Sequence, residues 1–206
     1  MSSERLDWIY AATDPEDLQR RYDEWSAHYD ADMDVLDWAA PGAAAAQCLD
    51  QGGRGGVVLD AGCGTGQVGV ALRTGGAARV IGIDFSAGML AKAALTGAYD
   101  ELLQASLTEA LPLAPGSLDA VVSVGVFTFG HVGPGPLAAL GMLLRPGGTI
   151  TLSFRDDVFR DLGFAASVEE LSAAGQWALL RCSEPAALVT EHGEGVPMRV
   201  WTWRVG

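Results

Sequence analysis

The chain has 206 residues, a length that suits one domain with a sizeable core. Apolar residues make up 49% of it and charged residues 19%, which is the balance of an ordinary globular protein. The formal net charge is −13 at pH 7. Such a surface repels phosphate backbones, and because no cluster of lysine and arginine interrupts it, nucleic acid is disfavoured as a partner.

The cysteines and the start of the chain favour the cytoplasm. Cys48, Cys63 and Cys182 are scattered and lack the spacing of a metal site, and free thiols are typical of a reducing compartment. No charged start followed by an apolar run marks a signal peptide. The longest apolar stretch, around 121–129, is too short to span a bilayer. We therefore expect a cytoplasmic protein that binds neither metal nor membrane, and the sequence leaves its oligomeric state open.

A helix is predicted over residues 14–36. Tyr22, Trp25 and Tyr29 recur there at a spacing that places them on one helical face. The stripe is compatible with ordinary core packing. It is equally compatible with a lid whose apolar faces shield a ligand while its phenol hydroxyls bind that ligand. Of the three residues, Tyr29 is the one that we expect to contact a ligand.

Pro41 and Gly42 are expected to end this helical pattern. An alanine-rich helix is predicted directly after them, over 43–50. We therefore expect a helical lid over 1–54 and a core over 55–206, which together form one domain spanning the whole chain.

From residue 57 onward, apolar runs alternate with turn residues and helical segments. Strands are predicted over 57–60, 79–84, 99–104, 118–126, 149–154, 176–182 and 198–205. Helices are predicted over 66–73, directly after the capping residue Ser86, over 136–144 and over 168–174, and the RPGG segment at 145–148 is predicted to be a turn. This alternation indicates an α/β fold with a Rossmann-like, doubly wound sheet of seven strands, mostly parallel with an antiparallel last strand.

A glycine-rich loop follows the first of these strands. Gly62, Gly64 and Gly66 let the backbone turn sharply and approach a ligand closely, and the following helix offers free N–H groups. The loop lacks the third glycine of the dinucleotide fingerprint, where Gln67 stands, and it lacks the Lys-Ser/Thr pair of a phosphate loop. It is therefore either a tight structural turn or a cradle for a ligand without phosphates.

Asp84 ends the second strand and supplies the partner acid that such a cradle needs. A carboxylate at that position accepts hydrogen bonds from both hydroxyls of a ribose, although an acid there also suits a helix cap. Taken with Asp60 before the loop and with the strand–loop–helix context, the two signals together favour a nucleoside site.

Four segments resemble the successive motifs of class I S-adenosylmethionine-dependent methyltransferases. They are VLDAGCGTG, GIDFSAGML, LTEALPLAPGSLDAVVSVGVF and LLRPGGTITLSF, and they cover about 57–154. YDEWSAHYDADM and GVFTFGHV further resemble the Williams-Beuren-region methyltransferase-like group and its bacterial relatives. The resemblance implies a Rossmann-like fold and S-adenosyl-L-methionine as the cofactor.

The resemblance also implies roles for the residues around the loop. Gly62 and Gly64 are expected to lie against the methionine part of the cofactor, and Asp60 is expected to steady that end through the loop backbone or a water molecule. Asp84 is expected to hold the ribose.

Further roles follow for the adenine and for the sulfonium. Phe85 and Met89 are expected beside the adenine, and Gly125 is expected to face the sulfonium. The family often has an acid where this chain has Ser106, so the Ser106 hydroxyl and the Leu107 backbone are expected to accept from the adenine amino group. The full set expected at the cofactor is Asp60, Gly62, Cys63, Gly64, Asp84, Phe85, Met89, Ser106, Leu107, Gly125, Tyr22, Trp25 and Tyr29.

A sulfonium methyl group is already electrophilic, so the protein mainly has to align a nucleophile and exclude water. We expect a small organic acceptor with an oxygen or nitrogen nucleophile, for which a base assists. His131 follows the fourth strand and is the best candidate, either as that base or as a loop histidine that bonds the backbone. Tyr29 is the second residue expected to act in catalysis.

Other polar residues receive weaker expectations. His28 on the front helix and His192 in an acidic loop are expected to have no catalytic role. Arg155 follows the fifth strand, where it either binds an acidic group of the substrate or pairs with Asp156 or Asp157.

Three other functions remain open at the level of sequence. The bound sulfonium can assist a cyclisation, elimination or rearrangement without giving up its methyl group. A basic peptide can enter an acidic cleft, which allows protein methylation. A binder without catalysis is a further alternative, which the intact glycine loop and Asp84 disfavour.

Overall fold

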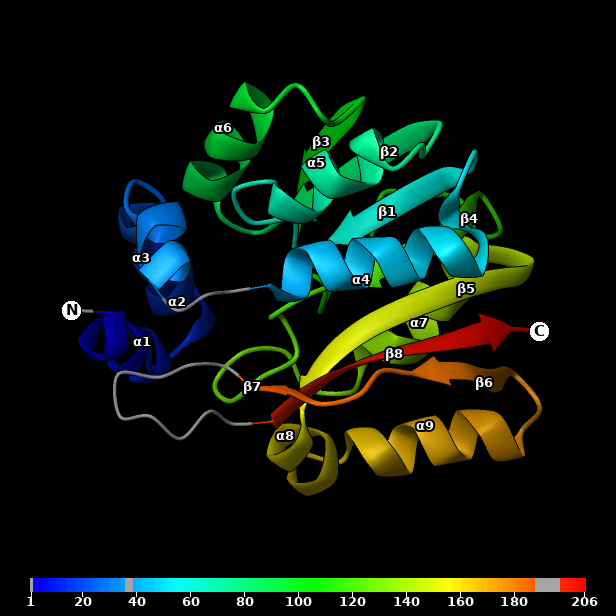
Figure 1. Ribbon diagram of the computed structural model, residues 1–206. Coiled ribbons are helices and arrows are strands. Elements are labelled where there is room, and N and C mark those ends of the chain that lie inside the picture. The colour runs from blue at the N-terminus through cyan, green and yellow to red at the C-terminus, as the bar shows by residue number, and fades with distance from the viewer. Residues whose placement is uncertain (1, 36–38, 188–196) are drawn as a thin grey trace.

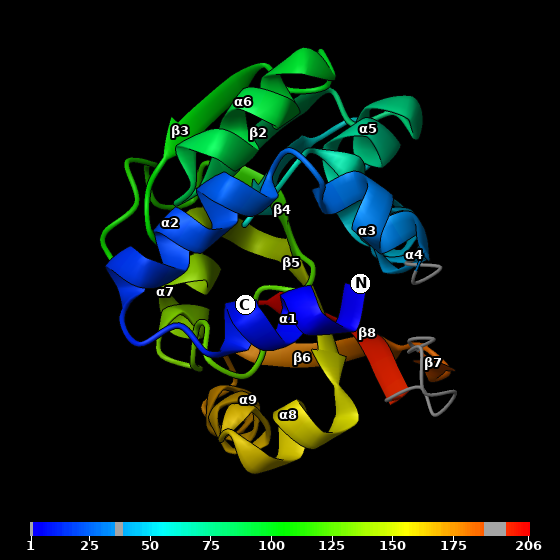
Figure 2. The ribbon, with the colours of Figure 1, turned by 90° about the vertical axis from the view of Figure 1, so that its left-hand side faces the viewer.

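The computed structural model describes residues 2–35, 39–187 and 197–206. A central sheet lies between two layers of helices, and three further helices stand at one end of it (Figure 1). These three, which we call the lid, are α1 (Ser2–Tyr10), α2 (Pro15–Trp25) and α3 (Tyr29–Val35). Seen from their side, they lie in front of the end of the sheet at which the first five strands finish (Figure 2).

The main strands are β1 (Val57–Ala61), β2 (Arg79–Asp84), β3 (Glu101–Gln104), β4 (Leu118–Ser123), β5 (Leu144–Arg155), β6 (Trp177–Cys182) and β8 (Pro197–Val205). They are hydrogen-bonded in the order β3-β2-β1-β4-β5-β8-β6. The first five are parallel to one another, whereas β8 is antiparallel to both β5 and β6. The predicted seven-stranded, mostly parallel sheet is therefore confirmed. The sequence does not predict β7 (Ala186–Ala187), a short strand that pairs with β8.

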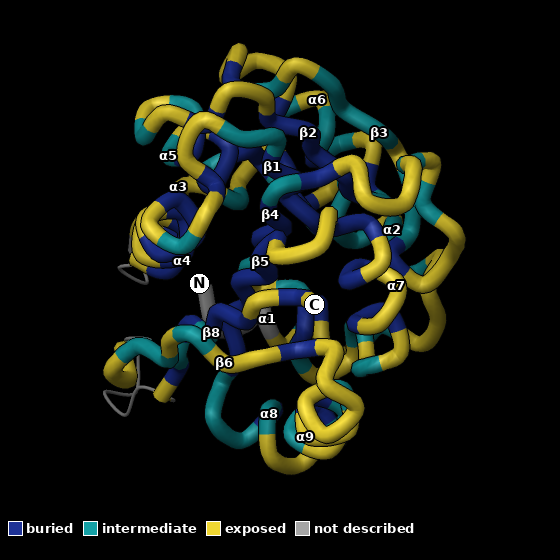
Figure 3. The backbone as a smooth tube through the Cα atoms, turned by 90° about the vertical axis from the view of Figure 1, so that its right-hand side faces the viewer, coloured by how far each residue is buried: buried dark blue, intermediate teal, exposed yellow. Residues whose placement is uncertain are grey.

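Helices cover both faces of the sheet. The remaining helices are α4 (Ala40–Cys48), the π-helix η1 (Leu49–Gly53), α5 (Gln67–Thr74), α6 (Ala87–Leu95), α7 (Pro136–Leu143), α8 (Asp156–Asp161) and α9 (Phe164–Ala173). One apolar core joins the sheet to α4 and α5, and a second joins its other face to α7, α8 and α9. Figure 3 shows the buried strands between helices whose outer surfaces are exposed. The sequence does not predict α1 or α8.

The two cores explain the uninterrupted apolar runs of the inner strands. In β1, Val58 packs into the core under α4 and α5, and the next residue, Leu59, packs into the core on the opposite face. In β4, Ala120 and Val122 face the first core and Val121 faces the second. Consecutive side chains that alternate between two cores are all buried in apolar surroundings, which accounts for the apolar runs over 57–59 and 120–122.

The RPGG segment is a bulge within β5 rather than a turn before it. While β4 advances from Leu118 to Ala120, β5 advances from Leu144 to Thr149. The extra residues bulge out of the ladder, and Gly147 there has φ +80°, a conformation that glycine adopts at little cost. The ladder therefore continues on both sides of the insertion.

The single helix predicted over 14–36 is two helices, α2 and α3, joined by a turn at residues 26–28. At the break, Ser26 Oγ donates a hydrogen bond to the carbonyl oxygen of Asp23 at 2.8 Å. Helix α6 approaches so closely here that a Cβ on Gly88 would lie 2.8 Å from Ser26 Oγ. Ending α2 at this point lets its last turn dock on α6, which a continuous amphipathic pattern does not reveal.

Pro41 and Gly42 lie inside the first turn of α4 and do not interrupt it. Proline suits that position because the first turn of a helix does not use its N–H groups. Helix α4 packs on the sheet, where the buried Gln47 side chain donates to the Val200 carbonyl oxygen at 3.1 Å and to Thr202 Oγ1 at 2.9 Å. The predicted lid boundary at residue 54 is therefore too late, and the lid consists of α1, α2 and α3.

Tyr99 lies in a slot that glycines leave open. A Cβ on Gly69 would lie 2.2 Å from Tyr99 Cζ, and one on Gly82 would lie 2.8 Å from its ring. Through this slot, the Tyr99 hydroxyl reaches under the glycine loop and donates to Asp60 Oδ2 at 2.7 Å. These two glycines are therefore required by packing, although neither has an unusual backbone conformation.

We expect Gly69→Ala to lower the free energy of unfolding by about 1–3 kcal/mol, because the added methyl group overlaps the Tyr99 ring. Gly42→Ala is the matched control, since a Cβ at this helical position would meet nothing within 4 Å. We expect the control to leave stability unchanged or to raise it by up to about 1 kcal/mol. Urea unfolding followed by circular dichroism measures both, and equal effects of the two substitutions would contradict the slot.

Candidate active site

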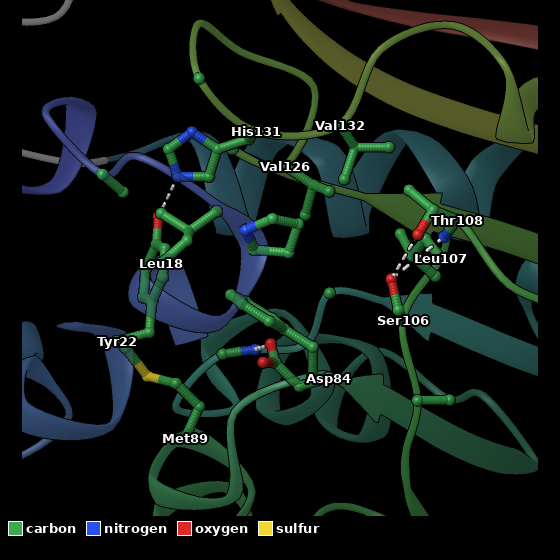
Figure 4. A pocket seen from close by; sticks show the side chains of 18 of the residues that line it. Leu18, Tyr22, Asp84, Met89, Ser106, Leu107, Thr108, Val126, His131 and Val132 are labelled. Atoms are coloured by element: carbon green, nitrogen blue, oxygen red, sulfur yellow. Dashed lines mark hydrogen bonds between the residues drawn. The ribbon is translucent and has the colours of Figure 1, made fainter. Parts of the chain in front are cut away.

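A cavity of about 360 Å³ lies between the lid and the carboxyl ends of the strands, within the size range of small-ligand sites (Figure 4). Its floor includes six residues that the sequence places at the cofactor: Gly62, Gly64, Asp84, Phe85, Met89 and Gly125. They come from the ends of β1, β2 and β4 and from the start of α6. The parallel sheet brings them together because the carboxyl ends of its strands share one edge.

The glycine loop is held open toward this cavity. Gly62 N donates to the Ile83 carbonyl oxygen at 2.7 Å, which ties the start of the loop to β2. A Cβ on Gly62 would lie 2.2 Å from Val126 Cγ2, so this glycine admits the loop that follows β4. Gly64 has φ +54°, and a Cβ there would meet nothing within 4 Å. The backbone at Gly64 therefore borders open space into which a ligand fits.

Asp84 is buried, and backbone groups hold its carboxylate. Gly64 N donates to Oδ2 at 2.8 Å and Ser86 N donates to Oδ1 at 2.9 Å. Burial raises the pKa of Asp84 to about 6, although these N–H groups oppose the shift. The carboxylate is therefore largely ionised at neutral pH, and each of its oxygens keeps a lone pair for a further donor.

One wall of the cavity combines apolar surface with two hydroxyl groups. Ser106, Leu107 and Thr108 line it across the cavity from Met89 (Figure 4). Ser106 Oγ and Thr108 Oγ1 form a hydrogen bond of 2.7 Å. The sequence reasoning names Ser106 and Leu107 but misses Thr108, which turns a single hydroxyl into a pair.

Three of the residues predicted at the cofactor lie outside the cavity lining. Asp60 is fully buried beneath the loop, where Tyr99 donates to one oxygen and burial raises the pKa of this carboxyl to about 7. Cys63 is buried, and burial raises the pKa of its thiol well above the usual value. Trp25 is buried in the lid, where its Nε1 donates to Asp32 Oδ2 at 2.7 Å. All three support the walls of the cavity from behind.

Two lid carboxylates dock the lid onto the sheet domain. Asp23 Oδ1 accepts from Ser86 Oγ at 2.6 Å and from the Gly88 N–H at 2.9 Å, at the start of α6. Asp30 Oδ1 accepts from Thr65 Oγ1 in the glycine loop at 2.6 Å. Sequence reasoning misses both acids, because nothing in the sequence distinguishes them from acids that face solvent.

Tyr22 and His131 meet at one side of the cavity (Figure 4), with Tyr22 Oη 2.6 Å from His131 Nε2. His131 Nδ1 lies 2.8 Å from the Phe129 carbonyl oxygen. A carbonyl only accepts, so Nδ1 carries the proton. Burial lowers the pKa of His131, so the ring is neutral at pH 7 and its Nε2 accepts from the Tyr22 hydroxyl. His131 thus both bonds the backbone and borders the cavity.

Tyr29 also lines the cavity but does not pair with His131. Its ring packs edge-on against Trp25, with the ring centroids 4.7 Å apart. Within the part of the chain that the structure describes, its hydroxyl has no hydrogen-bond partner, and burial raises its pKa above the usual value. Among the described residues the Tyr29 hydroxyl thus leaves its donor free for a ligand, and its expected contact with cofactor or substrate stays a prediction.

Two of the remaining polar candidates, His28 and Arg155, lie outside the cavity lining. His28 is exposed in the turn between α2 and α3. Arg155 pairs with Asp157 at 2.7 Å, and its guanidinium lies 5.4 Å from the centre of the Phe129 ring, so it takes the ion-pair alternative. His192 lies outside the described residues.

Comparison with known proteins identifies the family. Residues 58–148 match the family described as "Methyltransferase domain". Methyltransferase-like protein 27 of Homo sapiens is 33% identical over 190 residues, which are 88% of this chain and 76% of that protein. The chain belongs to the class I S-adenosylmethionine-dependent methyltransferases. The expectation drawn from the sequence motifs is thereby confirmed, and S-adenosyl-L-methionine is the cofactor.

Solved structures share the fold. The match with the Haloferax volcanii complex between the Trm112 methyltransferase activator and the putative methyltransferase has a TM-score of 0.70 at 20% identity, covering 89% of this chain and 97% of that one. The [4+2]-cyclase SpnF matches with a TM-score of 0.60 at 16% identity, covering 80% of this chain and 81% of that one. Such low identities show a common fold and nothing further.

The cavity fits a nucleoside with an amino-acid tail. The ionised Asp84 suits the two hydroxyl donors of a ribose, and the open backbone at Gly64 leaves room beside them. Among the described residues that line the cavity there is no lysine or arginine, which agrees with a ligand that has no phosphate. Over residues 2–35, 39–187 and 197–206, no helix is long and apolar enough to cross a membrane, and no group of three or more His, Cys, Asp or Glu side chains is placed to hold a metal.

We expect Asp84→Ala to weaken the binding of S-adenosylmethionine by tenfold or more, about 1.4 kcal/mol, because the ribose loses its acceptor. In the native protein, affinity should also fall as the pH drops below about 6, because protonation converts one acceptor oxygen into a donor. Calorimetric titration from pH 5 to 8 measures both effects. Asp60→Asn is the control for the second buried acid, and its affinity for the cofactor should keep the same dependence on pH. If the affinity of the native protein does not change between pH 5 and 8, Asp84 does not hold the cofactor.

We expect Asp23→Ala to loosen the lid while leaving the sheet domain intact. The substitution removes an acceptor from the first turn of α6, a loss comparable to that of a helix cap, about 0.5–2 kcal/mol. A loss of docking free energy near the middle of that range should raise the population of the open lid, and with it the rate of limited proteolysis within α1–α3, roughly tenfold. Glu16→Ala, at an exposed position of the same helix, is the matched control. Cutting at the native rate would show that Asp23 does not dock the lid.

Proposed function

We propose that this protein transfers the methyl group of S-adenosylmethionine to a small, uncharged organic acceptor through an oxygen or nitrogen nucleophile. The character of the cavity carries the proposal. Apart from Asp84 at the cofactor end, the one charged residue among its described lining residues is Asp14, whose side chain caps α2. The lid side offers the apolar Leu18 and the hydroxyls of Tyr22 and Tyr29. An acceptor with a carboxylate or phosphate would find no cation there.

The bound cofactor supplies an electrophilic methyl group, and the residues of the chain align the two reactants and exclude water from them. We infer that the cofactor binds at the end of the cavity formed by Gly62, Gly64 and Asp84. The acceptor then binds in the space under α2. Holding two reactants in line can lower a barrier by roughly 7–11 kcal/mol in favourable cases. The docked lid excludes water from the acceptor, and His131 is the neutral base that borders this space.

The docked lid supports a small acceptor over a protein. Helices α1, α2 and α3 lie across the carboxyl edge of the sheet (Figure 2), and α2 and α3 are each fixed by a carboxylate. A side chain on the surface of a folded protein can enter such a site only if the lid opens.

The cysteines bear on the compartment in which the reaction takes place. Cys48, Cys63 and Cys182 are free thiols, which supports a reducing compartment, and we place the reaction in the cytoplasm.

We expect a pooled panel of phenols, alcohols and aromatic amines, incubated with the protein and S-adenosylmethionine, to yield a product heavier by one methylene unit together with S-adenosylhomocysteine. Mass spectrometry of both products measures the transfer, and Asp84→Ala serves as the cofactor-binding control. A changed acceptor with intact S-adenosylmethionine would indicate a cyclisation, elimination or rearrangement, of the kind that the fold of the cyclase SpnF permits. If a basic peptide gains a methyl group while no compound of the panel does, the substrate is a protein and not a small molecule.

A further inference from the structure

The hydrogen bond between Tyr22 and His131 hides the only basic atom of the imidazole. His131 Nδ1 keeps its proton for the Phe129 carbonyl oxygen, so Nε2 holds the one free lone pair of the ring. Tyr22 Oη lies 2.6 Å from Nε2 and donates to it. With the lid docked, an acceptor cannot reach that lone pair directly, although both residues line the cavity.

We infer that Tyr22 is a catalytic residue: its hydroxyl oxygen receives the proton of an acceptor hydroxyl and passes its own proton to His131. This inference rests on the proposed methyl transfer. The Tyr22 hydroxyl has the right valence for the role, because it donates once and still has lone pairs with which to accept. Its ring is fixed by edge-on contacts with Phe85 and His131, at centroid distances of 5.6 Å and 5.5 Å, so the oxygen has a defined position.

The proton transfers balance without a further reactant. The acceptor oxygen forms its bond to the methyl carbon while the electrons of the carbon–sulfur bond stay on sulfur. The acceptor proton moves to Tyr22 Oη, and the Tyr22 proton moves to His131 Nε2. The imidazolium that results keeps its Nδ1–H on the Phe129 carbonyl oxygen, and it returns its extra proton to solvent when the lid opens.

The lid therefore completes the base as well as covering the site. Tyr22 immediately precedes Asp23, whose carboxylate fixes this turn of α2 on α6. His131 belongs to the loop after β4, a segment of the sheet domain far from α2 in the sequence. The pair forms when α2 docks, so the proton acceptor is assembled in the same step that excludes water.

Chemical modification tests the pair without knowledge of the acceptor. Diethyl pyrocarbonate, applied to the full chain with S-adenosylhomocysteine bound, reacts with free imidazole nitrogen, and peptide mass spectrometry separates His131 from the exposed His28. We expect His131 to react more slowly than His28 in the native protein. Tyr22→Phe should accelerate its reaction roughly tenfold, whereas the matched variant Tyr29→Phe should not. Equal rates in native protein and Tyr22→Phe would overturn the pairing.

Turnover with an acceptor hydroxyl from the mass-spectrometric panel tests the relay itself. We expect Tyr22→Phe and His131→Gln each to lower kcat by roughly a hundredfold, and the double variant to lose no more than either. Binding of S-adenosylhomocysteine by Tyr22→Phe should stay within about twofold, which shows that the variant folds and docks its cofactor. Losses that multiply in the double variant would overturn the relay. A panel without any methylated product refutes the proposed function, whereas a methylated product with a freely reactive His131 refutes only the relay.

Discussion

The carboxylate of Asp84 is the group around which the carboxyl edge of this sheet is arranged. A buried charge is tolerated only if hydrogen-bond donors surround it, and here the donors are the backbone N–H groups of Gly64 and Ser86. One of them belongs to the glycine loop and the other begins α6, so the same carboxylate joins the ends of β1 and β2. The requirement for Gly64 to approach Asp84 also sets the shape of the loop, and with it the floor of the cavity.

The lid depends on the same junction. Ser86 donates its backbone N–H to Asp84 and its hydroxyl to Asp23 of the lid, so one residue connects the cofactor end of the cavity to the helix that covers it. Docking by carboxylates explains in part why the front of the chain is rich in acids. It also makes the docked state reversible, because each of these hydrogen bonds contributes only about 1–2 kcal/mol and is exchanged for a hydrogen bond to water when the lid opens.

The sequence predicts most of the fold because periodicity and loop chemistry are local signals. The inner strands alternate between two cores, so their apolar runs are unmistakable, and β2 has the bounds that its pattern predicts. The predictions that are wrong concern features that depend on contacts between residues far apart in the sequence. The break between α2 and α3 depends on the close approach of Gly88, and the bulge in β5 depends on its partner strand. In the site, motif positions predict the glycines and Asp84 well. They cannot predict that Asp60 faces Tyr99, because that contact requires Tyr99 to cross beneath the loop.

The pairing of Tyr22 with His131 is also a long-range contact, and it changes the role that we assign to each of the two residues. A lone histidine after β4 is at once a plausible base and a plausible backbone anchor, and sequence alone does not separate the two. The structure shows that the anchor at Nδ1 is what makes Nε2 the acceptor, so the two readings describe a single arrangement. A relay that depends on a lid residue operates only in the closed state. With the lid open, His131 Nε2 has a free lone pair, but only the closed lid places the Tyr22 oxygen between that lone pair and the acceptor while water is excluded from the reactive methyl group.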